Sequence, residues 1–374
     1  MNNPEEFLQN NWQKQPCYLA NIFKARLDYL SADQLAGLAL EPEIESRLIS
    51  GSSKSKNWTL EHGSFEEDRF VDLNEQCWTL LIQSVDTWVP NTRNIINQFN
   101  FIPNWRFDDL MVSYAVDKGG VGPHIDNYDV FLLQASGTRR WRVGKMGDKP
   151  PIVDSNSPLP HVSDFEAVID VIMHPGDVLY IPPNTAHWGE SIGESIGYSI
   201  GYRSPQVDLL LSSIGENISN DYALNPFFTD PYRNKINKSG EIENELVSWA
   251  QKQLIKLSEN PNLLKSALAK QLSQSKLGIS EPTEKIDLDG LNSESIIQLS
   301  RDFKANWLSL DDEVQIYIEG ECWKFECKNQ QAIEKLVSYK RFPIKLFNFS
   351  PDLIDFPESF TSLINTGYIT LHNQ

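Results

Sequence analysis

The chain has 374 residues, of which 40% are hydrophobic and 11% aromatic, and its formal net charge is −18. This length is too great for one ordinary domain, so we expect two or three domains with real apolar cores. No apolar run approaches the roughly 18 residues of a membrane-spanning helix, and a surface this acidic repels nucleic-acid phosphates and attracts basic partners. The N-terminus shows no secretory signal, and the four scattered cysteines are typical of a protein of the reducing cytoplasm.

The first 110 residues are expected to mix helices and strands. Ser31 begins a stretch with the pattern of a capped helix, since a serine side chain can accept a hydrogen bond from the first turn. Strands are predicted at 57–60 and 78–84, and a helix near 92–101. Alternating apolar residues over 105–114 predict a further strand.

Residues 110–204 carry short apolar segments separated by glycine or proline turns. Regularly spaced short strands of this kind favour a β-sandwich or a barrel. The predicted strands are 129–134, 139–143, 167–173, 178–181 and 195–202.

Beyond Pro205 the pattern changes to helical spacing, which continues to about residue 278. These helices carry more apolar positions than one domain can bury, which predicts an association surface. Ser280 begins a linker, and 284–374 is expected to form a small α/β unit. Its predicted elements are strands near 313–318 and 322–327, a helix near 330–339 and a closing strand near 368–371.

Three polar residues of the β region form a candidate metal site. His124 and Asp126 follow a glycine-rich approach two residues apart, so on a strand both side chains share one face. His187 comes after a buried strand that Pro182 and Pro183 end, and we expect it just beyond that end. An isolated His-x-Asp is often only a surface or hydrogen-bonded pair. The third residue favours the facial triad of non-haem Fe(II) oxygenases, which leaves metal positions open.

An arginine follows on the predicted strand 139–143. If a small keto acid chelates the metal, the far carboxylate of that acid needs a cation, and arginine can form bidentate bonds to it. Alternation places Arg139 on one face of the strand and Arg140 on the other, so periodicity alone does not decide which one faces the site. Ser113 would add a hydroxyl donor to the same carboxylate.

These residues, with Asp-Val-Leu-Tyr-Ile-Pro-Pro before His187, resemble the JmjC oxygenases, which depend on Fe(II) and 2-oxoglutarate. The segments Gly-Gly-Val-Gly-Pro-His-Ile-Asp, Arg-Arg-Trp-Arg-Val-Gly and Trp-Thr-Leu-Leu-Ile-Gln-Ser-Val-Asp look like those of the bacterial ribosomal oxygenases. The resemblance implies an α+β chain in three parts. The first part, 1–205, would be a JmjC catalytic domain with its core at 90–205, folded as a double-stranded β-helix of the cupin-like jelly-roll type. The second part, 206–280, would be a helical dimerisation region. The third part, 281–374, would be a winged-helix-like domain.

The resemblance also implies an activity. Members of this family hydroxylate the β-carbon of an arginine in large-subunit ribosomal protein sixteen. By the same resemblance, iron would be held by His124, Asp126 and His187, and 2-oxoglutarate by Arg139 and Ser113. Oxygen is the second co-substrate, and no catalytic side chain is expected beyond the metal site. We expect a cytoplasmic homodimer that binds a basic ribosomal protein and neither DNA nor membrane.

Several points stay open at this level. An arginine substrate should meet carboxylates at the mouth of the site, and Asp117, Asp129 and Glu190 are unranked candidates. The alternative functions are a JmjC hydroxylase or demethylase of another basic protein, and a metal-binding cupin without oxygenase activity, which would need no cation at position 139. DNA binding by the last domain is disfavoured because acidic residues outnumber basic ones over 285–374.

Overall fold

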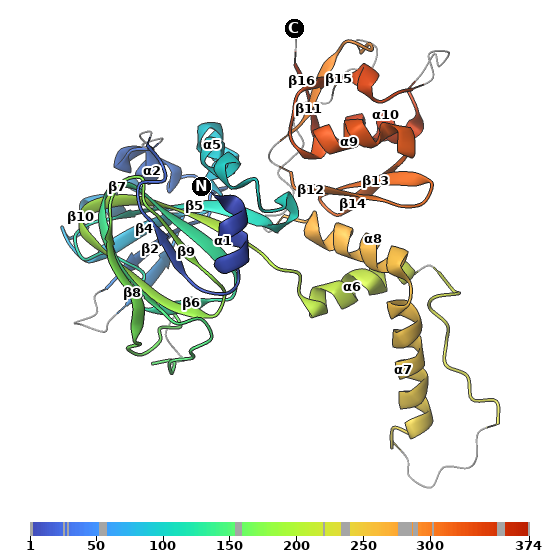
Figure 1. The fold of residues 1–374 in the computed structure, drawn as a ribbon, viewed down its shortest axis with the longest axis horizontal. Coiled ribbons are helices and arrows are strands. Elements are labelled where there is room, and N and C mark those ends of the chain that lie inside the picture. The colour runs from blue at the N-terminus through green and yellow to red at the C-terminus, as the bar shows by residue number, and fades with distance from the viewer. Residues whose placement is uncertain are drawn as a thin grey trace. The chain divides into compact units, whose positions relative to one another are not determined.

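Figure 1 shows the structure of the chain, a computed structural model. It describes residues 3–24, 27, 30–51, 58–153, 159–219, 221–232, 240–275, 286, 291–300, 303–349 and 356–372. The chain divides into two compact units, Met1–Ser204 and Pro205–Gln374. Within the described ranges, no helix combines the length and the apolar character that crossing a membrane requires.

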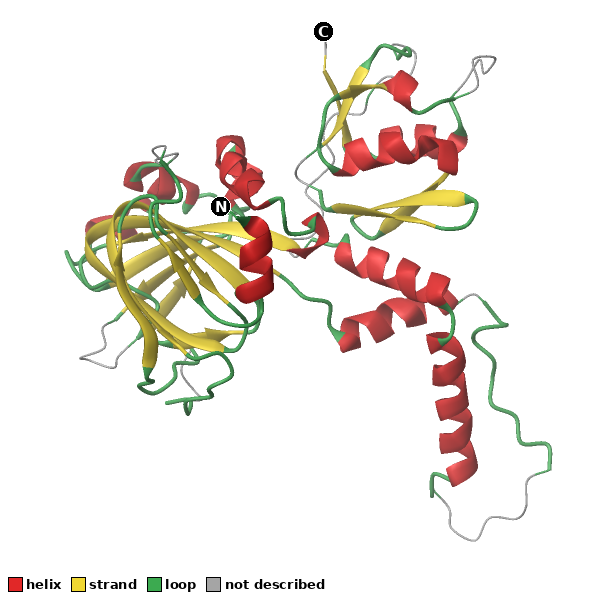
Figure 2. Cartoon of the chain, in the orientation of Figure 1, coloured by secondary structure: helices red, strands yellow, loops and turns green. Residues whose placement is uncertain are grey.

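The first unit is built on a ten-stranded antiparallel sheet that curls round on itself, drawn in yellow in Figure 2. The strand order is β1-β9-β7-β10-β5-β4-β2-β3, with β6 added beside β10 and β8 beside β7. The strands are β1 (Cys17–Leu19), β2 (Ser46–Ser50), β3 (Thr59–His62), β4 (Trp78–Ile82), β5 (Phe107–Ala115), β6 (His124–Asp126), β7 (Asp129–Gly144), β8 (Ala167–Met173), β9 (Val178–Ile181) and β10 (Thr185–Tyr202).

The two faces of this sheet are covered differently. One face packs with helices α1 (Pro4–Asn10) and α2 (Ala32–Leu38) around a large apolar core that includes Phe131, Tyr180 and Tyr202. The opposite face, which we call the inner face, encloses a smaller core. Its buried members are Val130, Leu132, Val143, Met173, Leu179 and Ile181.

Helix α2 begins where the sequence predicts. The hydroxyl of Ser31 accepts a hydrogen bond from the backbone N–H of Gln34 at 3.2 Å, and the Gln34 side chain accepts one from the backbone N–H of Ser31 at 2.9 Å. This reciprocal pair satisfies two backbone donors that would otherwise be unpaired at a helix start. The capped helix is therefore confirmed.

The other predicted elements of this region differ in detail. The strand expected at 57–60 is β3, which begins two residues later, and residue 57 lies outside the described part of the chain. The helix predicted near 92–101 is a series of short turns. The turns and short helices of this unit are α3 (Glu67–Val71), α4 (Val85–Trp88), η1 (Pro90–Thr92), α5 (Arg93–Ile96), η2 (Asn97–Phe99) and η3 (Asn104–Arg106).

The longest strands, β7 and β10, pair along almost their whole lengths, whereas the sequence predicts shorter strands interrupted at 135–138. The predicted turn is a bulge, because the register shifts where Ser136 and Gln134 meet β10. Past the bulge, odd-numbered residues of β7 face inward instead of even-numbered ones. Leu132 and Arg139 therefore share the inner face.

The position expected for His187 needs a correction. It lies beyond the end of β9, as predicted, but inside β10, a strand that was expected to begin only at 195. The two prolines after β9 do interrupt the sheet, but the chain re-enters it at Thr185. This matters because a residue inside a strand has its side-chain direction set by cross-strand pairing.

The second unit begins with helices α6 (Val207–Ile218), α7 (Asn244–Ser258) and α8 (Pro261–Leu272), in the region where helices are predicted. Helices α6 and α8 pack together around Ile214, Ile218 and Ala267. Helix α8 also contacts the sheet that follows it, where the side-chain amide of Asn306 donates to the carbonyl of Ala269 at 2.9 Å. The helices and the C-terminal α/β part thus form one compact unit.

The remaining elements form two three-stranded sheets, β15-β11-β16 and β12-β13-β14, with two helices. They share an apolar core that contains Phe303, Phe347 and Phe360. The linker predicted from Ser280 lies outside the described residues. The elements are β11 (Ile296–Leu299), β12 (Ala305–Ser309), β13 (Glu313–Ile318), β14 (Glu321–Glu326), η5 (Cys327–Asn329), α9 (Gln330–Val337), β15 (Phe342–Pro343), η6 (Ile344–Leu346), α10 (Glu358–Asn365) and β16 (Ile369–His372).

Candidate metal centre

The structure brings together the three residues predicted as metal ligands. Strand β6 pairs with the start of β10 in a register that sets His124 opposite His187 and Asp126 opposite Thr185. The Asp126 Oδ2 atom lies 3.6 Å from His187 Nε2 and 3.8 Å from His124 Nε2. One ligand atom from each residue lies within 4.8 Å of the other two. Two imidazoles and a carboxylate at this spacing can bind one divalent ion and leave other positions of that ion open.

Backbone carbonyls set the orientation of both imidazole rings. The Nδ1 atom of His124 lies 2.9 Å from the carbonyl oxygen of Gly122, and that of His187 lies 3.0 Å from the carbonyl oxygen of Thr185. A carbonyl can only accept, so Nδ1 carries the proton and Nε2 keeps its lone pair. Burial, followed by the neighbouring His124, lowers the pKa of His187 to about 4. The ring is therefore neutral at physiological pH, which is the form that binds a metal.

The glycine-rich segment before β6 is held from its other side by His161. The Nε2 atom of His161 lies 2.7 Å from the carbonyl oxygen of Val121, and the backbone N–H of Val162 donates to the carbonyl of Pro123 at 2.9 Å. Between these contacts, Gly122 has a φ of +84°, and a Cβ there would lie 2.4 Å from His161 Nε2. Only glycine fits this position. Nothing in the spacing of His161 from the motif indicates this role.

Arg139 is buried on the inner face of β7, with 7% of its surface exposed. It lies opposite Ser191 of β10 and Met173 of β8. Among the described residues no carboxylate forms an ion pair with it, and burial lowers the pKa of its guanidinium to about 10, so it remains charged. A buried cation without an anionic partner is costly, so this site is suited to bind an anion.

Ser113 lies beside Arg139 on the neighbouring part of the inner face. Its hydroxyl oxygen accepts a hydrogen bond from Arg139 Nη1 at 2.7 Å, and its O–H donates to the carbonyl of Gly197 at 3.2 Å, a bond it can exchange for one to a ligand. Gly197 is the cross-strand partner of Ser113, and a Cβ there would lie 3.3 Å from Arg139 Nη1 and 3.5 Å from Ser113 Oγ. The absent side chain leaves room over both groups. The donor set and the space therefore fit one carboxylate of a dicarboxylic acid.

The structure decides between the two adjacent arginines. Arg140 points away from the inner face and forms a bidentate ion pair with Asp170, with N to O distances of 2.8 and 2.6 Å. Glu190 lies directly opposite Arg140 on β10, so its side chain also points outward. Glu190 is therefore removed from the candidates for a substrate-arginine pocket.

Asp129 is also removed from these candidates. It is fully buried on the helix-covered face and accepts hydrogen bonds from the Tyr180 hydroxyl at 2.6 Å, the Gln13 side chain at 2.8 Å and Arg106 at 2.8 Å. These contacts tie the N-terminal segment to the sheet. The role of Asp129 is structural.

Asp117 has a local role in a turn. Its Oδ1 atom accepts a hydrogen bond from the backbone N–H of Gly193 at 2.9 Å, and its Oδ2 atom lies 3.2 Å from the Lys118 ammonium. The Gly193 hydrogen bond, followed by Lys118, lowers the pKa of the Asp117 carboxyl. Its charge is thus engaged in holding this turn.

Asp109 and Tyr128 are inner-face residues that the sequence reasoning missed. Side chains alternate along β5, so Asp109 and Met111 point to the same inner face as Ser113. In this register Ser113 pairs with Gly197 of β10, and Met111 pairs with Ser199. The pKa of the Tyr128 phenol is raised first by burial, then by the charge of Asp126 and a hydrogen bond to that carboxylate, and then by the charge of Asp109. Tyr128 thus contacts the predicted metal ligand Asp126 and lies near Asp109. Counting back by twos from Ser113 is the signal that could have found Asp109.

The side chain of Asp109 is held by other polar groups of this face. The Gln83 amide donates to Asp109 Oδ2, and Arg47 donates to the Gln83 oxygen at 2.8 Å. Met111 and Ser199 beside it are partly exposed. The arrangement offers a carboxylate, a phenol ring and a thioether next to the metal cluster.

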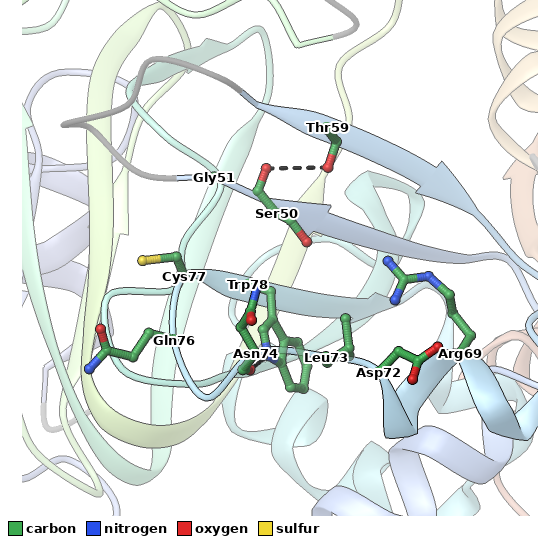
Figure 3. Close-up of a pocket in the computed structure, with 10 residues that line it drawn as sticks. All are labelled: Ser50, Gly51, Thr59, Arg69, Asp72, Leu73, Asn74, Gln76, Cys77 and Trp78. Carbon is green, nitrogen blue, oxygen red and sulfur yellow. Dashed lines mark hydrogen bonds between the residues drawn. The ribbon is translucent and has the colours of Figure 1, made fainter.

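A hollow of about 300 Å³ lies at the end of β2 and the beginnings of β3 and β4, apart from these residues (Figure 3). Its one arginine, Arg69, is already engaged, since its guanidinium donates to Glu61 at 2.8 and 2.6 Å. We assign no function to this hollow. Its lining residues are Ser50, Gly51, Thr59, Arg69, Asp72, Leu73, Asn74, Gln76, Cys77 and Trp78.

Comparison with known proteins shows which family this chain is similar to. Residues 94–210 match the JmjC domain family. The chain is 33% identical to the ribosomal protein uL16 3-hydroxylase of Escherichia coli, over 97% of this chain and 96% of that protein. It is 34% identical to a probable ribosomal oxygenase of Haemophilus influenzae, over 85% of this chain and 81% of that protein.

Solved structures agree with these matches. The X-ray structure of Escherichia coli ycfD superposes with a TM-score of 0.82 at 32% identity and covers 99% of this chain and 98% of that chain. A structure of the ribosomal oxygenase YcfD from Escherichia coli in complex with cobalt and 2-oxoglutarate superposes with a TM-score of 0.79 at 30% identity over the same shares.

Proposed function

The chain belongs to the JmjC-domain ribosomal oxygenases, and from this premise we propose that it is an Fe(II)- and 2-oxoglutarate-dependent hydroxylase of an arginine β-carbon in ribosomal protein uL16. The observation that carries the proposal is that the metal-ligand cluster shares the inner face of the sheet with a buried arginine that has no carboxylate partner in the described chain. A cupin that only bound a metal would have no need for that buried cation.

Each group at the site has a defined part in this reaction. His124, Asp126 and His187 would hold the ferrous ion, which together with oxygen and 2-oxoglutarate supplies the oxidant for C–H hydroxylation while the keto acid becomes succinate and carbon dioxide. Arg139 and Ser113 would bind the distal carboxylate of 2-oxoglutarate. The Gly122 and Thr185 carbonyls keep the Nε2 lone pairs of the two histidines directed at the metal position. No side chain has to act as a general base.

The substrate arginine fits the group formed by Asp109, Met111 and Tyr128. A guanidinium pairs favourably with a carboxylate, stacks on an aromatic ring and packs its methylene groups on a thioether. Tyr128 follows the ligand Asp126 by two residues and is hydrogen-bonded to it, so we place the substrate arginine beside the metal position. The Asp109 Oδ2 atom already accepts hydrogen bonds from the Gln83 amide and the Ser84 backbone N–H, but Asp109 lies on the inner face near Tyr128, so we favour it over the three carboxylates considered from the sequence.

We further propose that the protein acts as a homodimer through its helices. Helix α7 contains no buried residue, and its side chains Val247, Leu254 and Ile255 are 45%, 57% and 56% exposed. A helix of this length with its apolar residues in water is only marginally stable, so a second copy is the natural cover. Closed two-fold symmetry is the commonest arrangement for such a surface.

The proposed substrate also sets the compartment. A bacterial ribosomal protein is made and assembled in the cytoplasm, so we propose that the enzyme works there. The acidic net charge of −18 favours a basic ribosomal protein over nucleic acid as the partner.

Mass spectrometry of the substrate tests the function. The protein is incubated with Fe(II), 2-oxoglutarate, oxygen and a mixture of purified ribosomal proteins, and uL16 should gain the mass of one oxygen atom on an arginine. A matched incubation with the His187→Ala variant controls for spontaneous oxidation. Loss of methyl groups from another protein, without oxygen gain on uL16, would support a demethylase instead.

A further inference from the structure

The hydrogen bonds of Arg139 leave little of its guanidinium for a ligand. A guanidinium has five N–H donors. Nε donates to the Ser195 hydroxyl at 2.7 Å, and Nη2 donates to the carbonyl oxygens of Ser113 at 3.0 Å and Ser195 at 3.2 Å. One N–H of Nη1 donates to the Ser113 hydroxyl at 2.7 Å. Among the described contacts, a single N–H of Nη1 remains, so the fork cannot bind a carboxylate in the bidentate way that the sequence predicts.

Two serine hydroxyls continue the contact at Nε. Ser195 Oγ lies 2.6 Å from Ser191 Oγ, and the Ser191 hydroxyl donates to the carbonyl of Gly193 at 2.7 Å. Each hydroxyl has one proton, which sets the direction of the chain. Arg139 donates to Ser195, Ser195 donates to Ser191, and Ser191 donates to Gly193. We call this series the serine relay.

The serine relay is buried and anchored at its far end. Ser191 and Ser195 are 2% and 1% exposed. The carbonyl of Gly193 accepts the last hydrogen bond of the series, and Asp117 holds this turn by accepting a hydrogen bond from the Gly193 N–H at 2.9 Å. The turn occupies the irregular part of β10, between the two stretches that pair regularly with β7. The relay therefore connects Arg139 to a fixed point of the sheet.

The free N–H of Arg139 coincides with the available space. Gly197 leaves its side-chain position open next to Nη1 and Ser113 Oγ, the two atoms that lie 3.3 and 3.5 Å from where a Cβ would be. Rotation of the guanidinium would move Nη1 out of this space. The contact at Nε, together with the two contacts at Nη2, opposes this rotation and so helps to fix where the carboxylate can be received.

We propose that Ser195 and Ser191 are positioning residues for the co-substrate, because their relay holds Arg139 so that its one remaining Nη1 N–H meets the distal carboxylate of 2-oxoglutarate. The Ser113 hydroxyl donates to the carbonyl of Gly197 at 3.2 Å and would turn from it to the same carboxylate. This inference rests on the proposed function. It adds two residues that do not touch the co-substrate and replaces the bidentate contact by one bond from each of two side chains.

Direct binding of 2-oxoglutarate to the full-length protein loaded with Mn(II) tests the relay without turnover. Calorimetry should give a dissociation constant for Ser195→Ala about tenfold or more above wild type, as expected when a hydrogen bond to a charged group is lost. Ser191→Ala should weaken binding less, by roughly threefold, since Ser195 keeps its contact with Arg139. Mn(II) affinity should not change in either variant, and in turnover the KM for 2-oxoglutarate should rise while kcat is kept.

The double variant separates a relay from two independent packing effects. Once Ser195 is alanine, Ser191 no longer acts on Arg139, so Ser191→Ala/Ser195→Ala should bind 2-oxoglutarate as weakly as Ser195→Ala alone. Additive losses in the double variant, or wild-type binding by Ser195→Ala, would overturn the proposal. Ser46→Ala is the matched control, since Ser46 is equally buried and donates to Ala39 instead. If the wild-type protein itself bound no 2-oxoglutarate, the proposed function and not the relay would be refuted.

Discussion

His124 and His187 are direct cross-strand partners on β6 and β10, with ring centroids 4.2 Å apart. Their separation is thus set by backbone pairing, and Asp126 takes its position from the same ladder. A site built this way does not depend on the metal to bring its ligands together. Loss of one ligand should therefore change metal binding more than folding.

The first prediction concerns this triad. Alanine at position 124, 126 or 187 should abolish 2-oxoglutarate turnover, because two remaining ligands hold ferrous iron weakly. Succinate production with added Fe(II) measures it, and circular dichroism should show a folded chain. His174→Ala is the control, since His174 is exposed in the turn between β8 and β9. Wild-type succinate production by Asp126→Ala would exclude the triad.

The second prediction separates the two arginines. Arg139→Ala should raise the KM for 2-oxoglutarate by about a hundredfold, because a buried charge-assisted contact is lost, and iron binding should survive. Arg140→Ala, which removes only the exposed ion pair with Asp170, should leave the KM unchanged. The reverse result would assign the co-substrate to Arg140.

The third prediction tests the arginine pocket. Asp109→Asn keeps the shape of the side chain and removes its charge, so the KM for the protein substrate should rise by on the order of tenfold to a hundredfold. Consumption of 2-oxoglutarate without protein substrate should continue. Glu190→Gln removes an outward-facing charge and should have no effect. Equal losses in the two variants would point to overall charge and not to a pocket.

The fourth prediction concerns His161. His161→Ala removes the contact that holds the Val121 carbonyl, and the loosened segment before His124 should lower iron affinity by about tenfold, as outer contacts of metal ligands typically do. Competition with a chelator of known affinity measures the change. His62→Ala, at an exposed position of β3, is the matched control. Unchanged iron affinity in His161→Ala would show that the loop holds its shape without it.

The fifth prediction is the oligomeric state. Light scattering should give twice the chain mass of 42.7 kDa. Leu254→Glu together with Ile255→Glu should give the monomer mass, because two charges cannot be buried in an apolar interface. Val168→Glu, on the exposed face of β8 in the other unit, should leave the dimer intact. A wild-type mass of 42.7 kDa would rule the dimer out.

Residue patterns alone predicted the β core, the capped helix at Ser31 and the trio His124, Asp126 and His187. The strands, the capped helix and the pair His124 and Asp126 depend on local order, because alternation along a strand and turn residues at its ends act over a few positions. The position of His187 beside that pair depends on the pairing of β6 with β10. The inner face of β7 did not follow from alternation alone. The bulge after Gln134 changes which residues face inward, and a bulge depends on the partner strand.

The neighbours of each charged group were decided only by the tertiary structure. Asp129 and Asp109 look alike in the sequence, but β7 carries the first into a buried network on the helix-covered face, and β5 carries the second to the inner face beside Tyr128. Arg139 could be identified as a cation for a carboxylate, but the number of donors it offers depends on Ser195, far along the chain. The sequence determines which chemical groups are present. The pairing of distant strands determines which of these groups stay available to a ligand, because a donor or acceptor that is hydrogen-bonded within the protein cannot also bind the ligand.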